Sequence, residues 1–472
     1  MTTNFELFTT TALIASFSAV VSAFIGYPVG NWMAGLGQRT KRLVSSLVLI
    51  PFLLPPFLIG LTLLPLQATE INSITGIFWI ISAHVLMNAG FMASVVAASQ
   101  VPKDQIEAAS LDGASSLRAR LEIELPQQLS GILSAALLVA LYSATSYGLV
   151  LTLGQGQVET LETRIATAAL RDLDLGFALL LAGLQTAVTL GFFILARAIR
   201  AEPSELFGGI ESTHRKSRLG QIMSLGLLVA IVIVIGGVFL RSWSMGPGLV
   251  GNFMNLAGRG TRDVLNVSVL EATGNSLRNL VVAGLIALPI AWLASGKRRT
   301  SYLVLLPIGI SPVVFGLLFL VLSGYLPTSF GTSWVLVPIV QSLFLIPLSY
   351  QVMRPARQAV SVEIRDAALI DGAVGWRMFS SVEGPLVRKP ITVAAAFVAL
   401  GSLGEFGAAS FLAYGSDATL PLVLFRLISR PGAENLGMAM TAASLFIVLV
   451  ALVVFVISGD SRSSRRDRQA AA

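Results

Sequence analysis

The sequence predicts an all-α protein that crosses a membrane about eleven times and is built from two homologous halves. First, 54% of the 472 residues are hydrophobic and only 12% are charged, which is too apolar for a soluble chain of this length. Second, apolar runs of about 20 residues, the length that crosses a hydrocarbon core, recur along the whole chain. Third, a polar stretch after the third run returns 259 residues later.

The apolar runs are distributed unequally along the chain. Five lie in the first 200 residues, at 11–34, 43–65, 74–98, 129–153 and 176–199. Six follow, at 219–240, 275–296, 302–323, 333–353, 391–413 and 436–458. Prolines in the second and eighth runs predict a matching pair of kinked helices: Pro51, Pro55, Pro56, Pro307 and Pro312. The run at 219–240 has no partner in the first half, so we expect one additional helix there.

Lys and Arg indicate the topology. Loops that stay in the cytoplasm keep more positive charge than loops on the other side of the membrane. If the polar stretch at 104–126 is cytoplasmic, alternate crossing places most of the 32 basic residues in the cytoplasm, and the N-terminus, "MTTNFE", outside. The net charge of +7 therefore needs no nucleic-acid partner. The lack of cysteine in the sequence excludes disulfides and thiolate metal sites.

The repeated polar stretch organises the chain. "EAASLDGASSLRARLEIELP" (Glu107 to Pro126) pairs with "DAALIDGAVGWRMFSSVEGP" (Asp366 to Pro385), and Glu124/Glu383 is among the identities. The same spacing continues downstream through Ser143/Ser402 and Thr160/Thr419. We therefore expect a first half at 1–200, a charged cytoplasmic linker at 201–218, a second half at 219–459 and a basic cytoplasmic tail at 460–472.

Each copy of the repeat predicts two short helices outside the bilayer. "EAASLDGA" favours a helix, Asp112-Gly113 is a turn signal, and the residues from Ser115 to Glu124 can form a second helix. The turn glycine is expected to need a positive φ. A solvated amphipathic loop would be the simpler interpretation of one copy. Two copies at the same topological place favour a docking element instead.

The two stretches resemble the EAA signature, Glu-Ala-Ala, three residues, then Gly, of permease subunits in binding-protein-dependent ABC importers. The signature and the acidic residue before its glycine fall on Glu107, Ala108, Ala109, Asp112 and Gly113, and on Asp366, Ala367, Ala368, Asp371 and Gly372. The second copy departs by Asp for Glu and by Gly384 where the first has Leu125. The resemblance implies a type I ABC importer-like fold with two fused permease halves. It also implies that the loops at 104–126 and 363–385 form coupling helices that dock on ATP-binding subunits.

The resemblance further implies partners, location and substrate class. Such a permease works in the bacterial plasma (inner) membrane, surrounded by lipid, with two copies of an ABC ATPase subunit and an extracytoplasmic substrate-binding protein. "SYGLVLTLGQGQVETLETRIATAAL" (Ser146 to Leu170) and the matching stretch Ser402 to Ile428 look most like fused permeases of the thiamine and ferric-iron group. Molybdate and sulfate permeases carry a stretch similar to "GEFGA" as well.

The sequence does not contain an ATP-binding loop of its own. A phosphate-cradling loop needs Gly, four residues, Gly-Lys and Ser or Thr, and no such run occurs. ATP is therefore expected on the partner ATPase. This chain is expected to bind no cofactor or metal and to catalyse no reaction itself.

A few polar residues inside the apolar runs are candidates for the translocation pathway. Glu405 is the only acidic residue within an expected span, and an ionised carboxylate at that depth is costly unless it faces protein, water or a cation. Ser402 lies in the same run, and Ser146, beside Tyr147, is the first-half equivalent of Glu405. His84 is a further candidate. For Glu405 and His84 the alternative is a structural hydrogen bond to a neighbouring helix.

Two other classes of function stay open at this point. An ion-coupled secondary transporter built from two repeats would also fit the duplication and the single carboxylate, but it leaves the repeated cytoplasmic loop unexplained. A membrane enzyme acting on lipids would need paired His or Asp/Glu ligands near an interface, which the sequence lacks.

Overall fold

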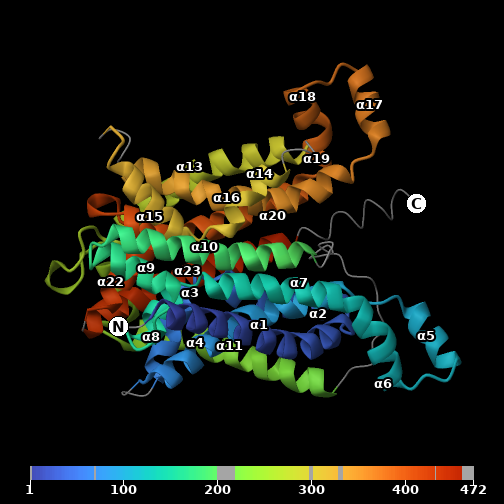
Figure 1. The fold of residues 1–472 in the computed structure, drawn as a ribbon, viewed down its shortest axis with the longest axis horizontal. Helices are drawn as coiled ribbons and strands as arrows, with labels where there is room; N and C mark the ends of the chain where they lie inside the picture. Colours follow the sequence, from blue (N-terminus) through green and yellow to red (C-terminus); the bar gives the residue numbers. More distant parts are fainter. Residues whose placement is uncertain are drawn as a thin grey trace. The chain divides into compact units, whose positions relative to one another are not determined.

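The computed structural model describes residues 3–67, 71–198, 218–296, 301–327, 333–430 and 432–459. Every regular element in these residues is a helix (Figure 1), which confirms the predicted fold class. The chain divides into two compact units, Met1–Phe253 with Ala433–Ala451, and Met254–Gly432 with Leu452–Ala472. The expected linker at 201–218 lies outside the described residues except for Arg218, and the expected tail at 460–472 lies wholly outside them.

The first unit contains the helices of the first repeat. They are α1 (Asn4–Ala34), α2 (Gln38–Leu53), α3 (Pro56–Leu63), α4 (Ser73–Ala98), α5 (Lys103–Leu111), α6 (Ser116–Ala119), α7 (Leu125–Ala144), α8 (Gly148–Gly154), α9 (Leu161–Leu170) and α10 (Leu175–Ala198). It continues with α11 (Arg218–Ser244) and most of α12 (Gly248–Asn255). A 3₁₀ turn, Leu64–Leu66, follows α3, and a π-helical turn, Arg120–Glu124, joins α6 to α7.

The second unit repeats this order. Its helices are α13 (Val269–Ser295), α14 (Ser301–Leu305), α15 (Pro312–Ser323), α16 (Ser333–Gln358), α17 (Val362–Ile370), α18 (Trp376–Met378), α19 (Gly384–Leu386), α20 (Arg388–Leu403), α21 (Gly407–Leu412) and α22 (Leu420–Ile428). Short 3₁₀ turns lie at Thr261–Asp263, Leu306–Gly309 and Gly415–Asp417, and a π-helical turn lies at Phe379–Glu383. The last helix, α23 (Ala433–Gly459), is shared between the units.

The number of candidate membrane spans agrees with the expected eleven when bent helices are counted as single spans. Eight helices in the described residues are long and apolar enough to cross a membrane, and three bent pairs raise the number to eleven. The bends measure 94° between α2 and α3, 101° before α15 and 90° before α20. Pro55 and Pro56 stand at the first bend and Pro312 at the second, which confirms the expected pair of kinks.

Two expected spans are interrupted, so the expectation of continuous helices at 129–153 and 391–413 is wrong. The first breaks between α7, which ends at Ala144, and α8, which begins at Gly148. The second breaks between α20, which ends at Leu403, and α21, which begins at Gly407. The short helices α9 and α22 that follow were not expected either. An average hydropathy over about 20 residues cannot detect a break of three residues.

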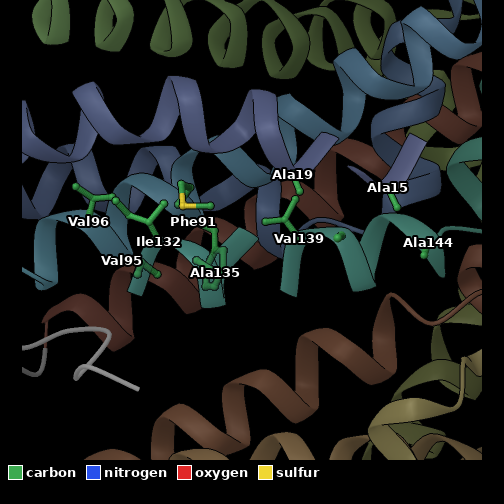
Figure 2. Packing of buried hydrophobic residues seen from close by; sticks show 11 residues of the cluster. Ala15, Ala19, Phe91, Val95, Val96, Ile132, Ala135, Val139 and Ala144 are labelled. Carbon is green, nitrogen blue, oxygen red and sulfur yellow. The ribbon is translucent and has the colours of Figure 1, made fainter. Parts of the chain in front are cut away.

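The core of each unit lies between equivalent helices. In the first unit, small and branched side chains of α1, α4 and α7 interlock, with Ala15, Ala19 and Val139 among them (Figure 2). In the second unit, Ala283 and Ala287 of α13 pack with Leu345 of α16 and with Val398 of α20, which is the equivalent of Val139. Gly30 allows the close approach of α1 to α4, since a Cβ there would lie 2.5 Å from the Ala93 carbonyl oxygen. Equivalent helices therefore form the core in both units.

The two halves also begin in the same way. Thr3 caps α1 and exchanges hydrogen bonds with Glu6, and Ser268 caps α13 and does the same with Glu271. Two turns further on, Thr11 Oγ1 accepts a hydrogen bond from the Leu161 amide at 3.0 Å, which holds the start of α9. In the second unit Ser276 Oγ accepts from the Leu420 amide of α22 at 2.9 Å. Each first helix is thus tied to the short helix after the break.

The packing units differ from the halves that the repeat predicts. The helix expected at 219–240 to open the second half is α11, and it packs in the first unit against α1, α2 and α3. Residues Ala433–Ala451 of α23 also belong to the first unit, where Thr441 Oγ1 lies 2.7 Å from Ser242 Oγ. Homology defines the halves and packing defines the units, so the two divisions need not agree.

Candidate coupling loops and translocation elements

The first coupling loop, residues 104–126, contains a helix that ends in a left-handed glycine turn. α5 stops where the Asp112 amide donates to the Ala108 carbonyl oxygen and the Ala114 amide donates to that of Ala109, both at 3.0 Å. Gly113 has φ +83°, the conformation that closes this type of helix end. No atom lies within 4 Å of where a Cβ would stand, so the backbone conformation and not crowding requires glycine here.

The second coupling loop, residues 363–385, has the same turn. The Asp371 amide donates to the Ala367 carbonyl oxygen at 3.0 Å, and the Ala373 amide donates to that of Ala368 at 2.8 Å. Gly372 has φ +77°. The two turns therefore confirm the expected positive φ at both signature glycines. They also assign the two alanines of each signature to the last turn of a helix, where their carbonyl oxygens close the turn.

Both loops present an exposed face. Glu107 and Asp112 are exposed in the first loop, and Asp366 and Asp371 are exposed in the second. Leu111 and Ile370, the last residues of α5 and α17, are almost wholly exposed although they are large and apolar. Figure 1 shows α5 and α6 beyond the end of the long helix α7. Exposed apolar residues beside acidic ones are the composition of a surface that binds another protein.

A buried carboxylate ends each loop. Glu124 and Glu383 are equivalent, and each is the last residue of a π-helical turn. Glu383 lies between two arginines: Arg365 Nε donates to its Oε1 at 3.0 Å, and Arg357 Nε donates to its Oε2 at 3.0 Å. Arg357 also donates to the Trp292 carbonyl oxygen of α13 at 2.8 Å. Glu383 therefore connects the second loop to both α13 and α16.

One turn after Glu124, Gln128 of α7 takes part in a set of amide contacts. The amide groups of Asn31, Gln100 and Gln128 lie together at this end of the first unit, where Gln100 Nε2 donates to Asn31 Oδ1 at 3.0 Å and Gln128 Nε2 donates to the same oxygen at 3.4 Å. The repeat showed the Glu124/Glu383 identity, but the sequence analysis did not predict its role. The signal that the sequence offered for a buried role of Glu124 is its position between two apolar residues, Ile123 and Leu125, just before an expected span.

Glu405 lies in the break between α20 and α21, where it caps the following helix. Its Oε1 accepts a hydrogen bond from the Ala408 amide at 2.6 Å and its Oε2 accepts from the Ala409 amide at 3.0 Å. A carboxylate at a helix N-terminus is stabilised by the unpaired amides and by the helix dipole. The structural alternative for Glu405 thus has direct support, and a role in the pathway stays a prediction.

The other pathway candidates fall into two groups. Ser402 exchanges hydrogen bonds with Gln341 of α16, donating to its Oε1 at 2.7 Å, in the second unit. Ser146 and Tyr147 form the equivalent break in the first unit, and Ser146 Oγ has no hydrogen-bond partner in the described part of the chain. His84 is buried on α4 with Nδ1 3.3 Å from Ser18 Oγ of α1. Its role in transport stays a prediction too.

Glu162 is a buried acidic residue that the sequence analysis missed. It lies in the first turn of α9 and is 0% exposed. In the sequence its neighbours "VETLETR" are polar, so this segment looks like a loop. Among the described residues, no group of three or more His, Asp or Glu side chains could hold a metal ion.

The structure repeats the loops with left-handed turns, the helix packing and the breaks in two halves. A family comparison decides what kind of membrane protein this is. The profile of the family "Binding-protein-dependent transport system inner membrane component" matches residues 26–202 and again 272–461. This chain belongs to that family. It is thus an ABC importer permease and not an enzyme, and the double match agrees with the two halves that the repeat predicts.

Individual relatives of this permease differ in their named substrates. The molybdenum transport system permease protein ModB of Haemophilus influenzae is 28% identical over 213 residues, 41% of this chain and 90% of the relative. The thiamine transport system permease protein ThiP of Brucella abortus is 27% identical over 416 residues, 84% of this chain and 73% of the relative. The sulfate transport system permease protein CysW of Escherichia coli is 25% identical over 256 residues, 50% of this chain and 86% of the relative.

Proposed function

We propose that this permease forms the translocation pathway of an importer for thiamine or a closely similar organic cation. The observation that carries the proposal is the extent of the likeness to ThiP, which spans both halves and 84% of this chain. The ModB and CysW relatives match about half of it. A permease that carries both halves in one chain is therefore what the thiamine relative and this protein share.

The charges of the buried residues support a cationic substrate. In the described part of the chain, four carboxylates are buried, those of Glu124, Glu162, Glu383 and Glu405, and no Lys or Arg is buried to the same degree. Glu162 and Glu405 lie in the helical bundles, away from the coupling loops. Carboxylates in a low-dielectric region attract a thiazolium cation and repel molybdate and sulfate. Ferric iron, also a cation, is the second candidate.

The proposed mechanism uses two ATPase subunits and an extracytoplasmic binding protein. Each ATPase would hold one coupling loop through its exposed face, with Leu111 or Ile370 in a groove. Closure of the ATPases on ATP would then move the loops, and the Arg357–Glu383–Arg365 contacts would pass the motion to α13 and α16. The bundles would rock between inward-open and outward-open states.

The mechanism fixes a topology, which is part of the proposal. The coupling loops face the cytoplasm of a bacterial cell, the N-terminus lies outside the inner membrane, and the basic tail at 460–472 is cytoplasmic. ATP binds to the partner subunits, and this chain holds no cofactor of its own.

The test is transport by the assembled complex in vesicles. The permease is reconstituted with its partner ATPase and substrate-binding protein, and uptake of labelled thiamine, ferric iron, molybdate and sulfate is compared with and without ATP. We expect ATP-dependent uptake of thiamine alone. Uptake of molybdate or sulfate would overturn the cation proposal, and uptake driven by an ion gradient without ATP would favour the secondary transporter.

A further inference from the structure

A cavity of about 650 Å³ lies between the second coupling loop and the bundle that carries it. Its walls come from the end of α13, the last turn of α16, α17 and the π-helical turn that ends at Glu383. Three of the lining residues are arginines, Arg354, Arg357 and Arg365, and the one acidic residue is Glu383. Among the described residues, the lining therefore carries an excess of two positive charges.

The hydrogen bonds of these arginines show which partner each positive charge has. Glu383 accepts from both Arg357 and Arg365 and so balances one charge. Arg354 Nη1 donates to the hydroxyl oxygen of Tyr350 at 2.7 Å, a neutral partner, and its guanidinium lies 5.5 Å from the centre of the Tyr350 ring. Three guanidinium groups beside one carboxylate in the described lining favour an anion in the space between them.

The first half does not have these arginines. At the spacing of 259 residues, the positions of Arg354, Arg357 and Arg365 correspond to Val95, Ala98 and Ile106. The first coupling loop has the same turn and the same buried glutamate without them. The common architecture of a coupling loop therefore does not require three arginines, and their presence in one half indicates a separate role.

The position of the cavity favours one kind of anion. Trp292, whose ring lies 4.4 Å from the guanidinium carbon of Arg357, precedes Leu293, which is largely exposed. Leu386, three residues after Glu383, is exposed as well. A Trp at a helix end beside exposed Leu side chains is typical of the level where lipid headgroups meet the hydrocarbon. Arginines bind phosphate groups through pairs of parallel hydrogen bonds.

We propose that this cavity binds the phosphate of an anionic phospholipid from the cytoplasmic leaflet. The phosphate accepts hydrogen bonds from Arg354 on α16 and Arg365 on α17, so an occupied cavity joins the coupling loop to the bundle. The inference goes beyond the proposed function, because it holds for any transported substrate.

The experiment measures lipid binding and not transport. The complete transporter, purified in detergent, is titrated with phosphatidylglycerol or phosphatidylcholine, and bound lipid is counted by native mass spectrometry. Arg354→Gln removes the charge, while the glutamine side-chain amide can still donate to Tyr350. Arg354→Lys keeps the charge but loses the planar guanidinium group that can donate two parallel hydrogen bonds to one phosphate. Arg377→Gln is the matched control, since it removes one positive charge from the same loop outside the lining.

We expect phosphatidylglycerol to bind about tenfold more weakly to Arg354→Gln, with an intermediate loss for Arg354→Lys and no change for Arg377→Gln. Equal losses in Arg354→Gln and Arg377→Gln would overturn the proposal, because they would mean non-specific attraction. Equal binding of phosphatidylcholine would overturn it as well. Inorganic phosphate that displaces the lipid at micromolar concentration would assign the cavity to a free anion instead.

Discussion

Leu111 and Ile370 occupy equivalent positions 259 residues apart, at the last residue of α5 and of α17, and are 88% and 87% exposed. Exposing a large apolar side chain to water to this degree costs free energy, and covering it with another surface removes that cost. The exposed apolar residue is repeated in both halves, directly before the left-handed turn, as the proposed docking on two ATPase subunits requires.

We expect Leu111→Asp to lower recovery of the ATPase with the purified permease about tenfold, because a charged side chain would replace an apolar anchor. Ile370→Asp should have a similar effect. Recovery is measured by quantifying both subunits after affinity purification through the permease. Leu173→Asp changes another highly exposed leucine of the first unit, outside the loop, and should leave recovery normal. Normal recovery in the Leu111→Asp, Ile370→Asp double variant would show that these residues do not anchor the ATPase.

Gly113→Val and Gly372→Val should reduce the rate of substrate-stimulated ATP hydrolysis in vesicles while the permease remains inserted. A β-branched residue avoids positive φ, and forcing it there costs about 1–2 kcal/mol, so the turn would rearrange and move the anchor. Gly113→Asn should be milder, because asparagine tolerates this conformation. Gly37→Val is the control at a glycine with open space and φ −58°. An unchanged ATPase rate in the double valine variant would contradict a coupling role for the turns.

Glu383→Gln should destabilise the protein by about 3 kcal/mol, measured as a lower midpoint of thermal unfolding in detergent. The substitution leaves Arg357 and Arg365 without the carboxylate that both contact in a buried place. Glu122→Gln provides the comparison, because its ion pair with Arg118 is exposed, at 65% for the arginine and 60% for the glutamate, and should contribute under about 1 kcal/mol. Similar shifts for both variants would mean that Glu383 is not a structural link.

Glu405→Gln should lower thiamine uptake without lowering the amount of assembled complex. Glutamine keeps one oxygen that can accept from the Ala408 amide, so the cap of α21 is weakened and not lost, while the negative charge disappears. Uptake and complex abundance are measured in the same vesicles. If the complex disappears with the uptake, the residue is a structural cap only. Unchanged uptake would exclude a pathway role.

The fold was predictable where the sequence repeats at a constant spacing. Gly113 and Gly372, and the alanines before them, predicted two equivalent loops with left-handed turns, which the structure has, because nothing has been inserted between them and the helices that follow. The helices at 11–34 and 275–296 were expected, but the equivalence of their capping residues escaped detection because the spacing is different: Thr3 and Thr11 match Ser268 and Ser276 at 265 residues and not 259. Six additional residues in that region are enough to hide an identical arrangement of caps.

The candidate site was less predictable because its contacts join distant residues. Arg357 and Arg365 lie 26 and 18 residues before Glu383, and nothing in their local sequence distinguishes them from other basic residues at a membrane face. Glu162 is buried in a segment that looks polar, because a hydropathy average sees neighbours in the chain and not neighbours in space. The breaks at 145–147 and 404–406 are shorter than the window that detects spans.

The place of Ala433–Ala451 in the first unit has a consequence for how the protein is made. A ribosome delivers helices to the membrane in order, so α1 to α11 are inserted long before α23 exists. Ser242 must wait for Thr441, which is translated 199 residues later, and Asn252 must wait for Gly437 on the same helix. The first unit cannot finish its packing until α23 has been made, and a chain that stops before α23 leaves a polar face open inside the bilayer for quality-control proteases to recognise.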